Sequence, residues 1–119
     1  MDEPKNRKIV FVSGDVMFWA RVHAAAKAAG SDAVRVGDEA GMEAAVRDGS
    51  VSRVIFDLGF KAFDAAACAA RWTSSSPRPQ LVAFGSHVDE DAMTAAKNAG
   101  FDVVMPNSRF HRTLPEWVA

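Results

Sequence analysis

Five short apolar runs, separated by stretches with helical periodicity, constrain the fold of this chain more than any other feature. They span residues 8–13, 32–37, 51–58, 80–85 and 101–105. Short runs rich in Val, Ile and Phe are typical of β-strands, and strands that alternate with helices form parallel sheets covered on both faces. Because the chain has 119 residues and 49% of them are hydrophobic, we predict one α/β domain over residues 1–119.

The stretches between these runs predict helices with narrow apolar faces. The first helix would turn inward Phe18, Val22, Ala25 and Ala29, and the fourth Val88, Ala92, Ala95 and Ala99. The last stretch differs from the others, because Pro115 interrupts the apolar face that carries Phe110, Leu114, Trp117 and Val118. We therefore predict a fifth helix that is short or broken into two turns.

Charge and cysteine content argue against several classes of function. The net charge is −1 and the acidic and basic residues are interspersed, so we expect neither nucleic acid nor a membrane surface as a partner. Cys68 is the only cysteine, which excludes an internal disulfide and a cysteine-based zinc site. The first apolar run, residues 9–12, is too short for a signal peptide or a membrane span, and we expect a cytoplasmic location.

A candidate site follows from the position of Asp57 at the end of the third run, just before a loop that contains Gly59. Open parallel sheets bind ligands at the carboxyl ends of their strands. Asp57 therefore has two interpretations: a phosphoacceptor or ligand residue, or a carboxylate that caps the loop and the following helix.

Other polar residues at the same edge also have two interpretations. Asp15 is expected to cap the first helix. Ser86 and Asp89 form an S-x-x-D pattern, which predicts a start of the fourth helix that resembles a capping box. The alternative is a functional loop over residues 86–89, because Ser86 and His87 would lie at the same sheet edge as Asp57.

The order of these elements, Asp57 after the third strand, and the Gly-Phe-Asp-Val-Val-Met run of residues 100–105 resemble the receiver domain of two-component response regulators. The resemblance covers nearly the whole chain and implies a flavodoxin-like, five-stranded parallel sheet in the order 2-1-3-4-5, with helices on both faces. Residues 83–89 and 106–110 are also similar to a set of small, stand-alone receiver-like bacterial proteins, which indicates an atypical receiver or pseudo-receiver.

The family's reactive positions can be carried over one by one. The phosphoacceptor position falls on Asp57, and the acidic pair after the first strand falls on Ser13 and Gly14, with Asp15 one residue later. The Ser/Thr position after the fourth strand falls on Gly85, with Ser86 one residue later, and the lysine position falls on Asn107. Of these reactive groups, only the phosphoacceptor stands where the resemblance places it.

These differences predict weak phosphorylation chemistry. Phosphoryl transfer to a carboxylate needs a divalent cation, and Mg²⁺ normally takes more than one carboxylate in such a site. Asp57 and Asp15 are weak candidates for ligands of this ion, and Asp15 would have to reach back across Gly14. Lys61 is expected to point elsewhere, and Asn107 carries no charge. We therefore expect no cofactor, and phosphorylation slower than usual by about two orders of magnitude or more.

The favoured function is a non-catalytic receiver-like module that regulates an unidentified protein partner without phosphorylation. One alternative is a receiver phosphorylated at Asp57 with Mg²⁺. The other is an enzyme at the strand-edge crevice that depends on a small molecule or a metal, with His87, His111 and Asp57 as conceivable ligands. The candidate partner surface is Trp19 with His23 on the first helix, or the Asp57 edge. Because a shortened fifth helix leaves little apolar area for a symmetric dimer, we expect a monomer.

Overall fold

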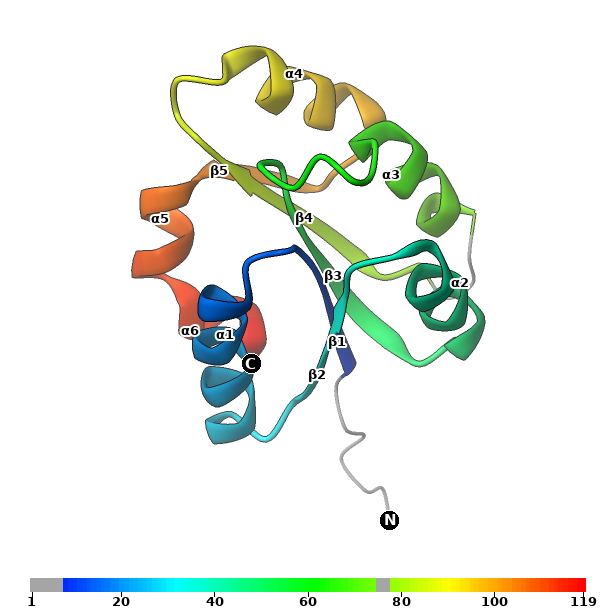
Figure 1. Cartoon of the computed structure of the whole chain (residues 1–119), viewed down its shortest axis with the longest axis vertical. Coiled ribbons are helices and arrows are strands. Elements are labelled where there is room, and N and C mark those ends of the chain that lie inside the picture. Colours follow the sequence, from blue (N-terminus) through cyan, green and yellow to red (C-terminus); the bar gives the residue numbers. More distant parts are fainter. Residues whose placement is uncertain (1–7, 75–77) are drawn as a thin grey trace.

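The computed structural model describes residues 8–74 and 78–119 and contains a five-stranded parallel sheet in the order β2-β1-β3-β4-β5 (Figure 1). The strands are β1 (Lys8–Val12), β2 (Asp32–Val36), β3 (Val51–Asp57), β4 (Gln80–Gly85) and β5 (Val103–Pro106). The predicted fold class and strand order are therefore confirmed, and the bounds of each predicted run agree with those of one strand to within two residues. The switch in strand order between β1 and β3 puts the carboxyl ends of these two strands side by side.

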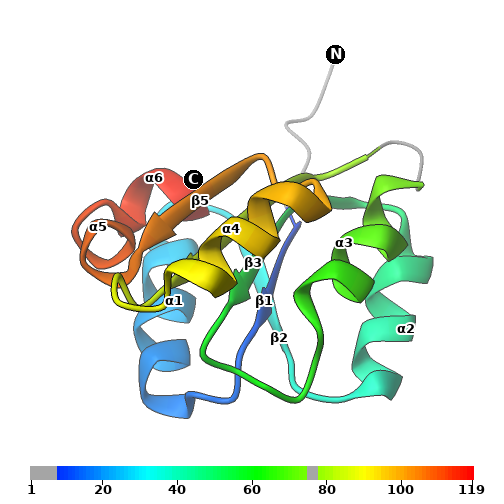
Figure 2. The ribbon, with the colours of Figure 1, turned by 90° about the horizontal axis from the view of Figure 1, so that it is seen from above.

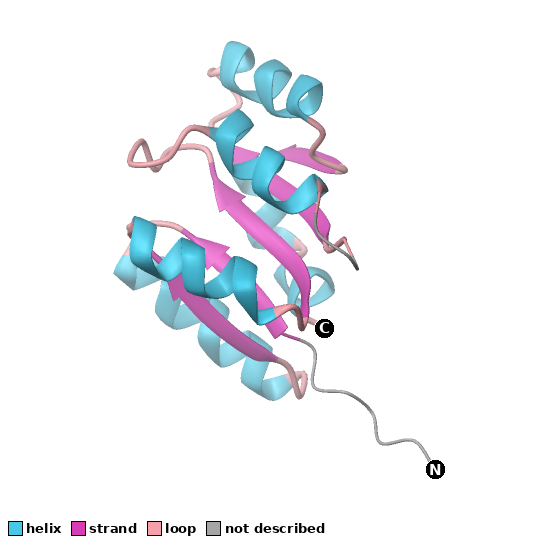
Figure 3. Cartoon of the chain, turned by 90° about the vertical axis from the view of Figure 1, so that its right-hand side faces the viewer, coloured by secondary structure: helices cyan, strands magenta, loops and turns pink. Residues whose placement is uncertain are grey.

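Helices cover both faces of the sheet. They are α1 (Val16–Ala28), α2 (Glu39–Asp48), α3 (Ala65–Thr73), α4 (Glu90–Ala99), α5 (Asn107–Arg112) and α6 (Leu114–Val118). Buried residues of α1, α5 and α6 pack on one face, and those of α2, α3 and α4 pack on the other (Figure 2). On this second face α3 and α4 lie next to each other (Figure 3).

Four helices start in the same way, with an aspartate whose carboxylate accepts a hydrogen bond from the backbone N–H three residues later. These aspartates are Asp15, Asp38, Asp64 and Asp89. The capping role predicted for Asp15 is confirmed. The predicted start of the fourth helix at Ser86 is wrong, because the stronger cap is Asp89, and Val88 lies before the helix with 77% of its surface exposed.

Aromatic rings fill the core under α1 and α5. Phe84 stacks on Phe110 with 4.2 Å between the ring centroids, and Phe18 meets both rings edge-on at 5.8 and 5.6 Å. Val22 and Ala26 complete the inner face of α1, whereas Ala29, which the periodicity placed inward, is exposed at the helix end. This core fixes the first turn of α1 and the start of α5 beside the end of β4.

The C-terminal helix is broken as predicted, into α5 and α6, with Thr113 between them. Pro115 lies in the first turn of α6, where the missing N–H has no partner to lose. Arg53 of β3 then holds α6 in place: its Nη1 donates to the Trp117 carbonyl at 2.6 Å, and its guanidinium lies 5.9 Å from the centre of the Trp117 ring.

Within residues 8–74 and 78–119, no helix combines the length and the apolar character that crossing a membrane requires.

The contacts of Arg53 with α6 predict that Arg53→Ala destabilises the protein by about 1–2 kcal/mol, because the substitution removes a charged hydrogen bond and a ring contact at once. Urea unfolding measures the change. The matched control is Arg47→Ala, on the exposed side of α2, which should change stability by less than about 0.5 kcal/mol. Equal effects of the two substitutions would contradict the role given to Arg53.

Candidate functional site at the carboxyl edge of the sheet

Asp57 is half-buried at the end of β3, in the middle of the sheet, and both of its carboxylate oxygens accept hydrogen bonds from the protein. Oδ2 accepts from Ser13 Oγ at 2.8 Å, and Oδ1 accepts from the Gly59 backbone N–H at 2.9 Å. Asp57 thus caps the loop between β3 and α3, as one interpretation predicted. It does not cap the helix, because Asp64 does so.

Ser13 is fully buried and connects three strands at this edge. Its hydroxyl donates to Asp57 and accepts from the Asp15 backbone N–H at 3.0 Å, while its own N–H donates to the Val36 carbonyl at 3.3 Å. Arg35, a residue that the sequence did not single out, donates from Nη1 to the Ser13 carbonyl at 2.9 Å. Hydrogen bonds through Ser13 therefore connect the ends of β1, β2 and β3.

Phe60 occupies the space beside Gly14, one of the two positions that correspond to the acidic pair. A Cβ atom at Gly14 would lie 2.9 Å from Phe60 Cε1 and 3.0 Å from Cδ1, closer than real Cβ atoms approach other atoms. A carboxylate side chain at this position would therefore have to displace the ring. The loop after β3 thus places an aromatic ring where the resemblance places a metal-binding carboxylate.

Leu58 fills the corresponding space at Gly85, where the resemblance places a Ser or Thr. A Cβ atom at Gly85 would lie 3.0 Å from Leu58 Cβ and 3.1 Å from Cδ1. Leu58 is itself buried, and its backbone N–H donates to the Phe84 carbonyl at 2.8 Å, which fixes the chain close to β4. A larger residue at position 85 would therefore require Leu58 to shift.

The other predicted residues lie at the same edge without reaching Asp57. Ser86, His87 and Asn107 are all exposed. The Ser86 hydroxyl accepts only a long bond, 3.4 Å, from the Val88 N–H, and in the part of the chain that the structure describes Asn107 makes no hydrogen bond to Asp57.

Lys61 points away from the site, as expected. Its Nζ donates to the Leu58 carbonyl at 3.0 Å and lies 3.8 Å from Asp89 Oδ2. Lys61 therefore does not take the place that the family's lysine would have.

His111 of α5 lies near enough to Asp15 and Asp57 to interact with them electrostatically. Its ring packs against Phe18, with 4.2 Å between the ring centroids. Burial lowers the pKa of His111, and the nearby Arg21 lowers it further, while the carboxylates of Asp15 and Asp57 act in the opposite direction. His111 thus faces the site as a neutral ring near pH 7.

The residues present do not fit a Mg²⁺ ion. Mg²⁺ needs near-octahedral oxygen ligands with free lone pairs. Asp15 uses Oδ1 to cap α1, each Asp57 oxygen already has one lone pair in a hydrogen bond, and a carboxylate at Gly14 would have to displace the Phe60 ring. Over residues 8–74 and 78–119, no group of three His, Cys, Asp or Glu side chains is placed to hold any metal ion. The metal site suggested for His87, His111 and Asp57 is therefore not formed.

Trp19 and His23, the pair expected on the partner surface, are neighbours with 5.2 Å between their ring centroids. Trp19 is half-buried, and its ring stacks on Phe11 at 6.0 Å, so that much of it belongs to the core. His23 is exposed. The Trp19 ring therefore serves to cover the core, and less of it is open to a partner than an exposed patch would offer.

Comparison with known proteins gives likeness in structure only. No family model matches the chain, and no curated protein matches its sequence. Solved structures of receiver domains do superpose on it.

One is the signal receiver domain of a response regulator from Bermanella marisrubri, at 12% identity and a TM-score of 0.77 over 97% of this chain and 100% of that one. A phosphorylated cyanobacterial phytochrome response regulator is 15% identical and superposes with a TM-score of 0.77 over 97% of this chain and 96% of that one. A third is the receiver domain of a sensor histidine kinase from Pseudomonas aeruginosa, which has a magnesium ion coordinated in its active site cleft. It is 15% identical and superposes with a TM-score of 0.70 over 96% of this chain and 98% of that one. The chain therefore has the fold of response-regulator receiver domains.

Gly85→Ser, which returns a hydroxyl to the end of β4, should destabilise the protein by about 1–3 kcal/mol because it overpacks against Leu58. In a Leu58→Ala background the same substitution should destabilise the protein less, since Cγ and Cδ1 of Leu58, two of the three atoms closest to the new Cβ, are absent. A double-mutant cycle in urea measures this coupling. Additive effects would show that Leu58 does not fill the space at Gly85.

The lowered pKa of His111 predicts a pH dependence of stability. Between the folded pKa and the ordinary value of about 6.5, the unfolded chain binds a proton that the folded protein does not. The contribution of neutral His111 to the free energy of unfolding is therefore complete above about pH 6.5, and it is lost as the pH falls from there through the folded pKa. His111→Phe keeps a ring against Phe18 and should flatten the profile of unfolding free energy over this range. An unchanged slope would refute the assignment.

Proposed function

We propose that this protein is a non-catalytic signalling module with the receiver fold, which regulates a protein partner through binding and without phosphorylation. One observation carries the proposal: the loop after Asp57 fills the phosphorylation site with its own apolar side chains. Phe60 lies against Gly14 and Leu58 against Gly85, so closely that a Cβ atom at either position would require the neighbouring side chain to move.

Electrostatics support the same conclusion. An incoming phosphoryl group brings negative charge to a carboxylate, and catalysis of its transfer consists of positioning and neutralising that charge. The solved relatives include a phosphorylated response regulator and a receiver domain with bound magnesium. In this chain Asp57 is neighboured instead by a neutral hydroxyl and a backbone amide, and the nearest lysine in sequence, Lys61, is bound to Leu58 and Asp89.

One observation favours an alternative, a receiver that is phosphorylated at Asp57. The carboxylate stands at the end of β3 in the middle of the sheet and is only half-buried. A phosphoryl donor that displaced the Ser13 bond could therefore still reach Oδ2. The two proposals differ in what the native chain does with a small phosphoryl donor.

Incubation with acetyl phosphate and Mg²⁺, followed by intact mass, separates them. We expect the native chain to remain at its unmodified mass. A rebuilt variant, Gly14→Asp with Phe60→Ala and Asn107→Lys, should gain one phosphoryl group, because it restores the second carboxylate and the lysine and removes the obstructing ring. Adding Asp57→Asn to that variant should abolish the gain. Phosphorylation of the native chain that is lost in Asp57→Asn would overturn the proposal.

If Asp57 has a structural role, Asp57→Asn should reduce unfolding stability by no more than about 1 kcal/mol, because the amide retains one acceptor for Gly59 and can donate to Ser13. Partner binding should survive. Thermal unfolding and binding measured on the same preparation test this. A variant of normal stability that loses its partner would indicate that the charge of Asp57 acts as a switch.

We also propose that the protein is a monomer in dilute solution. Phe110, Leu114 and Val118 are buried against the sheet of their own chain, so α5 and α6 offer little apolar surface to a second copy. A stable dimer needs about 800 Å² from each partner. Light scattering at micromolar concentration should give the monomer mass, and a dimer broken by Trp117→Ala would contradict this.

A further inference from the structure

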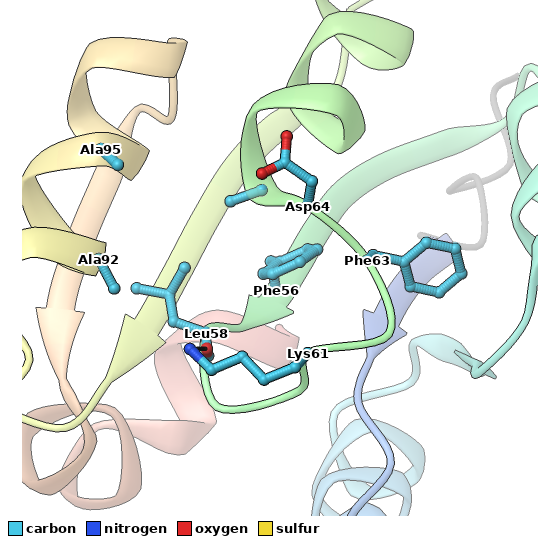
Figure 4. Close-up of a pocket in the computed structure, with 8 residues that line it drawn as sticks. Phe56, Leu58, Lys61, Phe63, Asp64, Ala92 and Ala95 are labelled. Carbon is cyan, nitrogen blue, oxygen red and sulfur yellow. Dashed lines mark hydrogen bonds between the residues drawn. The ribbon is translucent and has the colours of Figure 1, made fainter.

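A cavity of about 330 Å³ lies between α3 and α4, on the face of the sheet that these helices cover. Phe56 and Leu58, at and just after the end of β3, form its floor, and Ala92 and Ala95 of α4 form one wall (Figure 4). Figure 4 shows the side chains of Leu58 and Ala92 pointing toward each other, with Lys61 passing below them. The loop after Asp57 therefore lines this cavity as well as covering the Asp57 site.

Small side chains keep this groove open. Ala65 on α3 and Ala92 and Ala95 on α4 present only methyl groups to it. Ala95 is exposed and Ala92 half-exposed, so the cavity opens to solvent instead of being sealed in the core. Its volume is at the lower end of the range for ligand pockets, about 300–1,000 Å³. One apolar side chain of the size of Leu, Met or Phe suits it, whereas a dinucleotide does not.

The mouth of the groove is acidic. Asp64 caps α3, Asp89 caps α4, and Glu90 and Asp91 form the first turn of α4. Asp91 lies one helical turn before Ala95 and so faces the same side. Lys61 is the one cation lining the cavity, and it is already bound to the Leu58 carbonyl and to Asp89. Of these acids, Asp64 lines the cavity, Asp89 is paired with Lys61, and Asp91 lies on the Ala95 side of α4. Three carboxylates against one ammonium group leave two negative charges beside an apolar floor.

We propose that the α3–α4 groove is the docking site for a basic, amphipathic segment of a partner protein. The segment would insert one apolar side chain over Leu58 and place Lys or Arg side chains against Asp64 and Asp91. Burial of the anchor would supply most of the affinity, and the charges would supply specificity and speed of association. This inference rests on the proposed function, since it names the surface and the partner chemistry through which such a module would act.

The test uses the full chain and a defined probe. Short random peptides displayed on phage are selected on the immobilised protein, and the best peptide is synthesised. We expect the selected peptides to combine Leu, Met or Phe with neighbouring Lys or Arg residues. In amide NMR spectra of the protein, the synthetic peptide should shift the signals of Leu58, Ala65, Ala92 and Ala95. Its affinity should fall as salt is raised, because the acidic rim is exposed to solvent.

Matched variants locate the site. Ala95→Leu fills the groove from its exposed wall and should lower the affinity for the peptide by about tenfold or more, as the loss of one anchoring side chain would. Asp91→Asn should weaken it several-fold. The controls are Ala24→Leu, an exposed alanine on α1, and Asp32→Asn, an exposed acid on β2, and both should bind as the native chain does. Thermal unfolding verifies that each variant is folded.

Several outcomes would overturn the docking site. They are selected peptides without basic residues, NMR shifts that map to α1, an Ala95→Leu variant that binds normally, or no selected peptide at all. These results are independent of the phosphorylation test. Phosphorylation of Asp57 in the native chain would refute the proposed function while leaving the peptide map in place, and an unphosphorylated chain without a groove response would refute the docking site alone.

Discussion

The hydrogen bond from Ser13 to Asp57 is the interaction on which the rest of this sheet edge depends. Two carboxylates at the ends of β1 and β3 would repel each other unless a cation lay between them. A buried hydroxyl and one carboxylate satisfy each other directly, at 2.8 Å. The carboxyl ends of β1 and β3 are therefore joined by a direct side-chain hydrogen bond, and the Arg35 bond to the Ser13 carbonyl extends the same arrangement to β2.

The loop after β3 is adapted to this arrangement. With the Asp57 carboxylate fixed by Ser13 and Gly59, the following residues take positions close to β1 and β4. Phe60 then fits against Gly14 and Leu58 against Gly85. Leu58 has a second role, because its side chain also forms the floor of the α3–α4 groove. A ligand in that groove would thus contact a residue that is adjacent to Asp57, without using its carboxylate.

Much of the fold was predictable from local patterns, and the closure of the site was not. Apolar runs locate the strands, and Pro115 locates the break between α5 and α6, since each depends on residues adjacent in sequence. The start of α4 was misplaced because Ser86 and Asp89 are both good caps, and only the structure shows which of them bonds to the helix. The contacts of Gly14 with Phe60 and of Gly85 with Leu58 join distant segments. The sequence shows the glycines but not what packs against them.

Ser13 and Gly59 hold the Asp57 carboxylate in a setting that is poor for a divalent cation. A Mg²⁺ titration followed through the backbone amides of Ser13, Asp57, Gly59 and Gly85 tests this most directly. We expect no saturable change at these four amides up to about 10 mM Mg²⁺, since the ion would have to compete with the hydrogen bonds of Asp57 and lacks a second carboxylate at Gly14. Saturable shifts at Asp57 and Gly59 with sub-millimolar affinity, lost in Asp57→Asn, would contradict it.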